Sequence, residues 1–76
     1  MRLGATIRAY RHQRGLTQAA LAAKTGLHRT YIGRLERGLY DPSLLNLHRI
    51  AQVLQVPLSH LVQPLDTLPP VAEDVS

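Results

Sequence analysis

Two short helical segments around a glycine, within residues 18–35, constrain the fold of this chain more than any other feature. Residues 18–25 are rich in alanine, and Gly26, a residue type that often terminates helices, follows them. Thr17 stands in front of this segment as a good N-cap. After the turn at residues 26–28, a further helix is expected over about residues 29–37, ended by Gly38. The segment is therefore predicted to form two helices joined by a tight turn.

The second of these helices separates cleanly into two faces when each residue is advanced by about 100°. One arc holds Arg29, Thr30, Gly33, Arg34 and Arg37, and the opposite side holds Tyr31, Ile32, Leu35 and Glu36. An ordinary solvated face mixes charges of both signs, whereas this one has three arginines and no acid. Gly33 costs roughly 1 kcal/mol relative to alanine inside a helix, which makes sense if a partner approaches the backbone closely. The helix is therefore expected to lie in a DNA groove, with its apolar side held by a small core.

The rest of the chain predicts an all-α fold of five helices. Leu3, Ile7 and Tyr10 recur at helical spacing in a first helix that stops at Gly15. Ser43 caps a fourth helix, whose apolar stripe comprises Leu44, Leu47, Ile50, Ala51 and Leu54. A short fifth helix is expected over residues 58–62, after the break at Pro57. Residues 1–62 are predicted to form one domain, and residues 63–76, with three prolines in seven positions, a flexible acidic tail.

The charge is distributed unevenly along the chain. All nine Lys and Arg residues lie within residues 1–49, where only Glu36 and Asp41 oppose them, giving +7. Three acidic residues in the tail give −3, and together these account for the net charge of +4. A basic body of this kind indicates a polyanionic partner, either nucleic acid or an anionic membrane face.

Several classes of function are not supported by the composition. The chain has no cysteine, and its histidines (His12, His28, His48 and His60) share no spacing typical of metal ligands, so no metal site is expected. No signal-peptide or membrane-spanning stretch is seen, and a cytoplasmic protein, nucleoid-associated when bound to DNA, is expected. The chain has no cysteine nucleophile, no paired carboxylates in its body and no glycine-rich phosphate-binding loop, so neither an enzyme nor a cofactor or small-molecule ligand is expected.

The motif resembles the Cro/repressor-type helix-turn-helix family, also called XRE. The resemblance covers about residues 3–62 and rests on the run LTQAALA at residues 16–22, Gly26, Ile32, LERG at residues 35–38 and DPS at residues 41–43. It implies a compact, lambda-repressor-like five-helix domain. It also implies sequence-specific binding of double-stranded DNA, commonly as a homodimer on a two-fold operator.

The resemblance implies roles for individual residues. The positions expected to read bases in the major groove are His28, Arg29, Thr30 and Arg34. Those expected to contact the DNA backbone are Gln18, Arg37, Tyr40 and Asn46. His28 departs from the small hydroxyl residue common at its position, so it binds a phosphate or a base, or merely caps the helix.

Other positions of the motif are expected to serve the fold. Ala22 lets the two helices approach, and Gly26 permits the turn between them. The core is expected to contain Leu21, Ile32, Leu35, Leu47, Ile50 and Leu54. Arg11 and Glu36 match a family pair that joins two helices by a partly buried ion pair, although Arg11 could also reach a phosphate.

A different class of function competes with a DNA-binding repressor or autoregulator, namely a protein-binding module such as an antitoxin or adaptor. Leu39, Leu45 and Val53 fall off the apolar stripe of the fourth helix and are expected to form an exposed patch. Self-association is the simpler account of such a patch. The candidate dimer residues are Leu45, Val53, Leu58, Leu61 and Val62.

Overall fold

The computed structural model describes residues 2–62, which form five helices and no strand. The helices are α1 (Arg2–Gln13), α2 (Gln18–Thr25), α3 (Arg29–Glu36), α4 (Leu44–Leu54) and α5 (Leu58–Val62). The predicted all-α architecture is therefore confirmed. Helix α3 ends at Glu36, one residue before the expected end, because Arg37 already serves as its C-cap. The proposed acidic tail, residues 63–76, lies outside the described residues.

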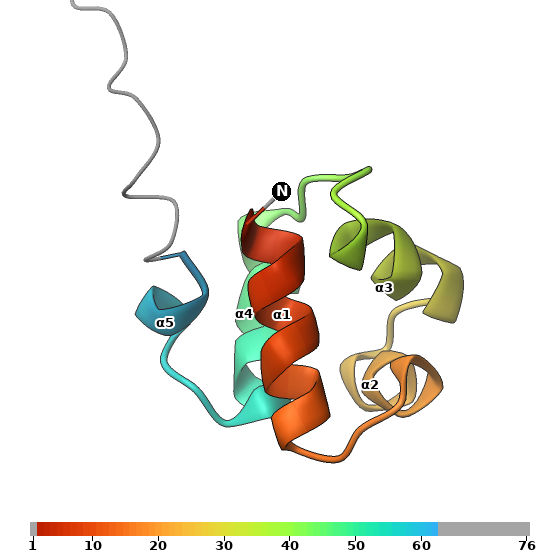
Figure 1. Cartoon of the computed structure of the whole chain (residues 1–76), viewed down its shortest axis with the longest axis horizontal. Helices are drawn as coiled ribbons and strands as arrows, with labels where there is room; N and C mark the ends of the chain where they lie inside the picture. The colour runs from red at the N-terminus through yellow and green to blue at the C-terminus, as the bar shows by residue number, and fades with distance from the viewer. Residues whose placement is uncertain (1, 63–76) are drawn as a thin grey trace, which may run out of the picture.

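Helices α1 and α4 form the centre of the molecule (Figure 1). Helices α2 and α3 lie to one side of this central pair, and α5 lies on the other side (Figure 1). Helix α2 packs against both α3 and α4, while α1 contacts α3, α4 and α5. The helix pair that carries the motif is thus supported from behind by the rest of the fold.

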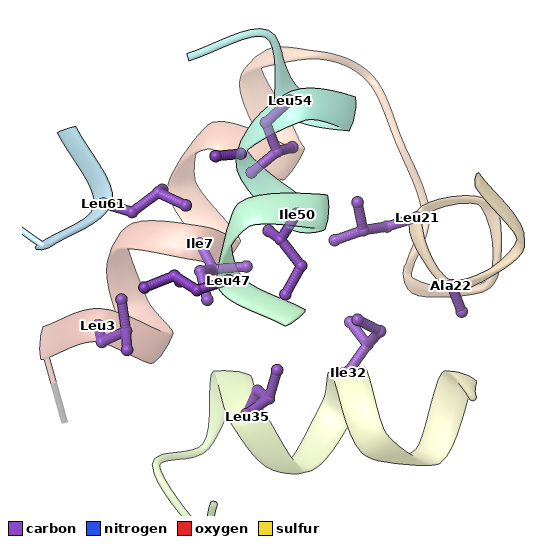
Figure 2. Packing of buried hydrophobic residues seen from close by; sticks show 11 residues of the cluster. Leu3, Ile7, Leu21, Ala22, Ile32, Leu35, Leu47, Ile50, Leu54 and Leu61 are labelled. Carbon is purple, nitrogen blue, oxygen red and sulfur yellow. The ribbon is translucent and has the colours of Figure 1, made fainter. Parts of the chain in front are cut away.

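The core draws at least one side chain from every helix. All six predicted core residues are at most 6% exposed, and Leu3 and Ile7 of α1 are buried with them. In Figure 2, Ile32 and Leu35 of α3 point toward Ile50 and Leu47 of α4. Burying a side chain of this size stabilises a fold by about 1.5–3 kcal/mol relative to leaving it in water. The apolar side of α3 is therefore what fixes this helix to the domain.

Two expectations about leucines are wrong. The apolar stripe predicted for α4 includes Leu44, yet this side chain is 72% exposed. It shares the helical face of Ala51, but it is the first residue of α4, and the burial of that face begins only at Leu47. Leu61 was a candidate for a dimer surface, yet it is 0% exposed. Because α5 folds back, Leu61 points into the core of its own subunit (Figure 2).

Gly4 allows α1 to approach α3 unusually closely. A Cβ atom at this position would lie 2.2 Å from the carbonyl oxygen of Leu35 and 2.8 Å from that of Glu36. Both contacted atoms belong to the backbone at the end of α3, so they cannot turn aside as a flexible side chain would. The position of α3 against α1 therefore requires glycine at residue 4.

Replacing Gly4 by alanine should lower the free energy of unfolding by about 1–3 kcal/mol, the usual cost of overpacking a filled interior. Urea denaturation followed by circular dichroism measures this change. Gly33→Ala is the matched control, since a Cβ atom there would meet the flexible side chain of Gln18 no closer than an ordinary 3.5 Å. The control should be as stable as the natural chain or more so, because alanine favours the helix. Equal stability of the two variants would contradict the close-approach argument.

Candidate nucleic-acid interface

Local capping interactions fix both ends of α2 and the turn that leads from it into α3. The Thr17 hydroxyl accepts a hydrogen bond from the N–H of Ala20 at 3.0 Å, which begins α2. Gly26 ends it in the left-handed conformation, with φ +74°, and donates its N–H to the carbonyl of Ala22. A left-handed residue lets the chain turn directly into the next helix, and glycine adopts it without steric cost. The sequence therefore encodes this turn locally.

Helix α3 presents a cationic face to solvent. Arg29, Thr30, Arg34 and Arg37 are exposed, and Gly33 is half-buried among them. On the opposite side, Ile32 and Leu35 are 0% and 2% exposed. The one acidic residue of α3, Glu36, is turned inward, so no carboxylate opposes the arginines on the exposed face of the helix. The two arcs predicted from the sequence are confirmed.

A shallow hollow lies on this face between α2 and α3. It is lined by Gln18, Arg29, Thr30, Gly33 and Arg37. Interior packing does not demand the glycine, because the nearest atom to a Cβ there would be in ordinary van der Waals contact. The missing side chain instead leaves open space beside two cationic groups. The hollow therefore offers an anionic group access to the backbone of α3.

A buried ion pair holds α3 in place from behind. The Arg11 Nε and Nη2 atoms donate to Glu36 Oε2 and Oε1 at 2.6 and 3.0 Å. The two side chains are only 9% and 2% exposed. Arg11 Nη1 also donates to the carbonyl oxygen of Leu16 at 2.9 Å, and Gln18 Nε2 donates to Glu36 Oε1 at 3.1 Å. One carboxylate thus links α1, α2 and α3, and Arg11 acts within the fold.

A second polar cluster connects α3 to the start of α4. Arg34 Nη1 donates to the Tyr40 hydroxyl at 2.6 Å, and the guanidinium carbon lies 5.5 Å from the centre of the Tyr40 ring. The Tyr40 ring stacks on the ring of Tyr31, with centroids 6.1 Å apart. Asn46 Nδ2 in turn donates to the Tyr31 hydroxyl at 3.2 Å. Sequence reasoning placed Tyr31 on the inner side of α3 and missed this link, because residues 31, 40 and 46 show no periodic relation.

The predicted DNA-contacting residues therefore divide into two groups. Arg29, Thr30, Gln18 and Arg37 surround the hollow, whereas Arg34, Tyr40 and Asn46 belong to the tyrosine cluster. His28 stands alone at the N-cap position of α3, exposed, and its side chain makes no capping hydrogen bond. Helix capping by its side chain is thus not its role here.

The candidate dimer residues differ in how much surface they offer. Leu45 is 58% exposed. Val53, Leu58 and Val62 are half-buried and pack against the core cluster. Leu61 offers nothing to a second subunit, as its burial shows. Two further leucines, Leu39 and Leu44, are also exposed, at 60% and 72%.

No helix within residues 2–62 is long and apolar enough to cross a membrane. Over the same residues, no group of three or more His, Asp or Glu side chains is arranged to hold a metal ion.

The architecture and the capped turn define a helix-turn-helix domain with a cationic second helix. The Helix-turn-helix family matches residues 7–61. The chain is 36% identical over 67 residues to the HTH-type transcriptional regulator y4dJ of Sinorhizobium fredii, covering 88% of this chain and 87% of that protein. The chain therefore belongs to the helix-turn-helix family of DNA-binding transcriptional regulators, and the XRE-type resemblance seen in the sequence is confirmed.

Solved structures show the same fold. The restriction-modification controller protein C.AhdI from Aeromonas hydrophila superposes with a TM-score of 0.77 at 37% identity, covering 79% of this chain and 91% of that protein. SinR from Bacillus subtilis, the master regulator for biofilm formation, solved in complex with DNA, gives a TM-score of 0.76 at 33% identity, covering 79% of this chain and 97% of that one.

Replacing Glu36 by alanine should lower the free energy of unfolding by about 3–5 kcal/mol, because the Arg11 charge would be left buried without a partner. Thermal or urea denaturation measures the loss. The combined variant Arg11→Met and Glu36→Leu is the control, since it removes both charges and keeps apolar volume. It should recover part of the lost stability. Equal destabilisation of the single and combined variants would show that charge compensation is not the reason for the pair.

Proposed function

We propose that this chain is a sequence-specific repressor or autoregulator that reads double-stranded DNA with α3 in the major groove. The single observation that carries the proposal is the exposed face of α3, where Arg29, Arg34 and Arg37 stand with no acidic neighbour on that face. A buried apolar side fixes the same helix to the core. The similar protein SinR was solved in complex with DNA, which supports the same class of partner here.

The side chains of this face suit two kinds of DNA contact. A guanidinium can bond O6 and N7 of guanine together, which is worth about 1–3 kcal/mol of discrimination, so we assign Arg29 and Arg34 to guanine. Thr30 is suited to a thymine methyl group or a phosphate, and His28 to a phosphate or a base edge. These four residues carry the proposed base reading.

Contacts to phosphates position the protein without reading sequence. We assign Gln18 and Arg37 to the DNA backbone, because both line the hollow beside Gly33. Gln18 uses one amide hydrogen on Glu36 and retains a second for a phosphate oxygen. Tyr40 and Asn46, the other two residues expected at the backbone, have polar groups already engaged with Arg34 and Tyr31.

We further propose that the protein acts in the cytoplasm as a homodimer on a two-fold operator. A C2 dimer places two copies of α3 on one side of the duplex, and this requires an operator with the same symmetry. Leu45 with the half-buried Val53, Leu58 and Val62 remains the candidate contact surface.

A second candidate function, binding another protein as an antitoxin or adaptor, is favoured by the exposed apolar side chains. Leu39, Leu44 and Leu45 are 60%, 72% and 58% exposed around the start of α4. A patch of this kind commonly marks a protein contact. If the protein's main role were to mask a partner, partner binding would survive Arg29→Ala, a change that should impair DNA reading.

Selection of bound sequences from a random duplex library at near-physiological salt tests the main proposal. We expect a palindromic site whose half-sites lie about one helical turn apart. Two protein chains should bind each selected duplex, as measured by sedimentation of the complex. Recovery of unenriched sequence would refute specific binding, and enrichment of a single half-site bound by one chain would refute the dimer alone.

Arg29→Ala and Arg37→Ala should weaken DNA binding in different ways. Arg29→Ala should relax the preference at one position of each half-site, by about 1–3 kcal/mol. Arg37→Ala should weaken all sequences about equally and reduce the salt slope by about one. Titrations of the selected duplex and its single-base variants at several salt concentrations measure both effects. Identical behaviour of the two variants would contradict the division between base and backbone contacts.

A further inference from the structure

We propose that Tyr40 is a specificity-determining residue that positions the Arg34 guanidinium for base reading, supported from behind by Tyr31 and Asn46. The inference rests on the proposed function and deepens it. It gives Tyr40 a role that acts through Arg34, in place of the independent phosphate contact expected from the sequence.

Arg34 is held at two points by the same ring. Its Nη1 atom donates to the Tyr40 hydroxyl at 2.6 Å, and its guanidinium carbon lies 5.5 Å from the ring centre. A hydrogen bond and a cation–π contact together restrict a long side chain that otherwise samples many rotamers. By comparison, Arg29 has no hydrogen-bonding or ionic partner among residues 2–62. The two arginines assigned to guanine thus differ in how far they are organised before DNA arrives.

The contact with Tyr40 leaves the reading edge of Arg34 available. A guanidinium has five N–H donors in a fixed plane, and Tyr40 takes only one, on Nη1. The edge formed by Nε and Nη2 keeps both of its donors for the O6 and N7 atoms of one guanine. Tyr40 therefore restrains the guanidinium without competing for the base.

Tyr40 is itself held in place, although it lies in the loop between α3 and α4. Its ring stacks on Tyr31, with an interplanar angle of 29°. The Tyr31 hydroxyl receives a hydrogen bond from Asn46 Nδ2, and the Asn46 backbone N–H is bound by the Ser43 hydroxyl that caps α4. The chain of contacts thus runs from the capped first turn of α4 to the tip of Arg34.

Restraint of this kind should raise discrimination at one base pair. Ordering a long side chain on binding costs free energy, and a side chain that is already ordered in the free protein does not incur that cost again. This saving in binding free energy applies only where the restrained guanidinium of Arg34 binds its matching guanine. Loss of the restraint should therefore reduce preference at the Arg34-dependent position by roughly three- to tenfold and leave the other positions unchanged.

A double-mutant cycle on the selected duplex tests the proposal. Affinities of the full chain for this duplex and each single-base variant are measured for the natural protein, Tyr40→Phe, Arg34→Ala and the combined variant. Tyr40→Phe keeps the stacked ring and removes only the hydroxyl, so the fold should be retained, as thermal denaturation will show. Tyr10→Phe is the matched control, because it removes another tyrosine hydroxyl, on α1, where the ring packs against Arg14.

Tyr40→Phe should lower discrimination only at the position that Arg34→Ala also affects, with the salt slope unchanged. In the Arg34→Ala background, Tyr40→Phe should have no further effect on base preference. Tyr31→Phe, which breaks the link to Asn46, should produce a smaller loss at the same position. Tyr10→Phe should behave like the natural protein.

Two other outcomes would separate a failure of the Tyr40 inference from a failure of the proposed DNA-binding function. The Tyr40 hydroxyl still has its own hydrogen and could donate it to a phosphate. If it does so, Tyr40→Phe will weaken all sequences equally, and the effect will persist without Arg34, which overturns this inference alone. If the natural chain enriches no sequence at all, the proposed function fails and the inference fails with it.

Discussion

The buried ion pair between Arg11 and Glu36 is the interaction on which the arrangement of the helices depends. Glu36 is the last residue of α3, and its carboxylate accepts hydrogen bonds from α1 through Arg11 and from α2 through Gln18. Three helices therefore meet at one group. A charged pair in the interior gains little net stability over apolar packing, but its two hydrogen bonds tie the end of α3 directly to α1. It fixes the orientation of α3, and that orientation decides which residues of α3 face outward.

Gly4 reinforces the same constraint through steric fit. It brings the start of α1 against the carbonyl oxygens at the end of α3, close to where Glu36 enters the interior. Electrostatics and close packing thus act on the same end of one short helix. An eight-residue helix is too short to be stable by itself in water, so tertiary contacts must supply its order. The exposed arginines can be arranged reproducibly only because the other side of the helix is held so firmly.

Much of the fold was predictable because its signals are local. Caps at Thr17 and Ser43 and a left-handed glycine at Gly26 mark helix ends through contacts within a few residues. The alternation of apolar and basic residues along α3 likewise follows from helical periodicity alone. Predictions failed where a residue's environment depends on distant elements. Periodicity put Leu44 on the buried face of α4, yet this side chain is 72% exposed, because the cover over a helix face is supplied by elements far away in the sequence.

The sequence by itself determined the helices, their caps, the core side of α3 and the cationic side opposite, because each depends on residues close together in the chain. Tertiary structure alone decided the rest. It placed Leu61 in the core, set Gly4 against α3, and joined Arg34 to Asn46 through two tyrosine rings. These outcomes depend on how far apart the packed helices and loops lie, and a distance between elements leaves no periodic trace in the sequence. Residues close together in the sequence thus determine which side chains lie on the exposed face of α3. The packing of the helices and loops determines how those side chains are positioned.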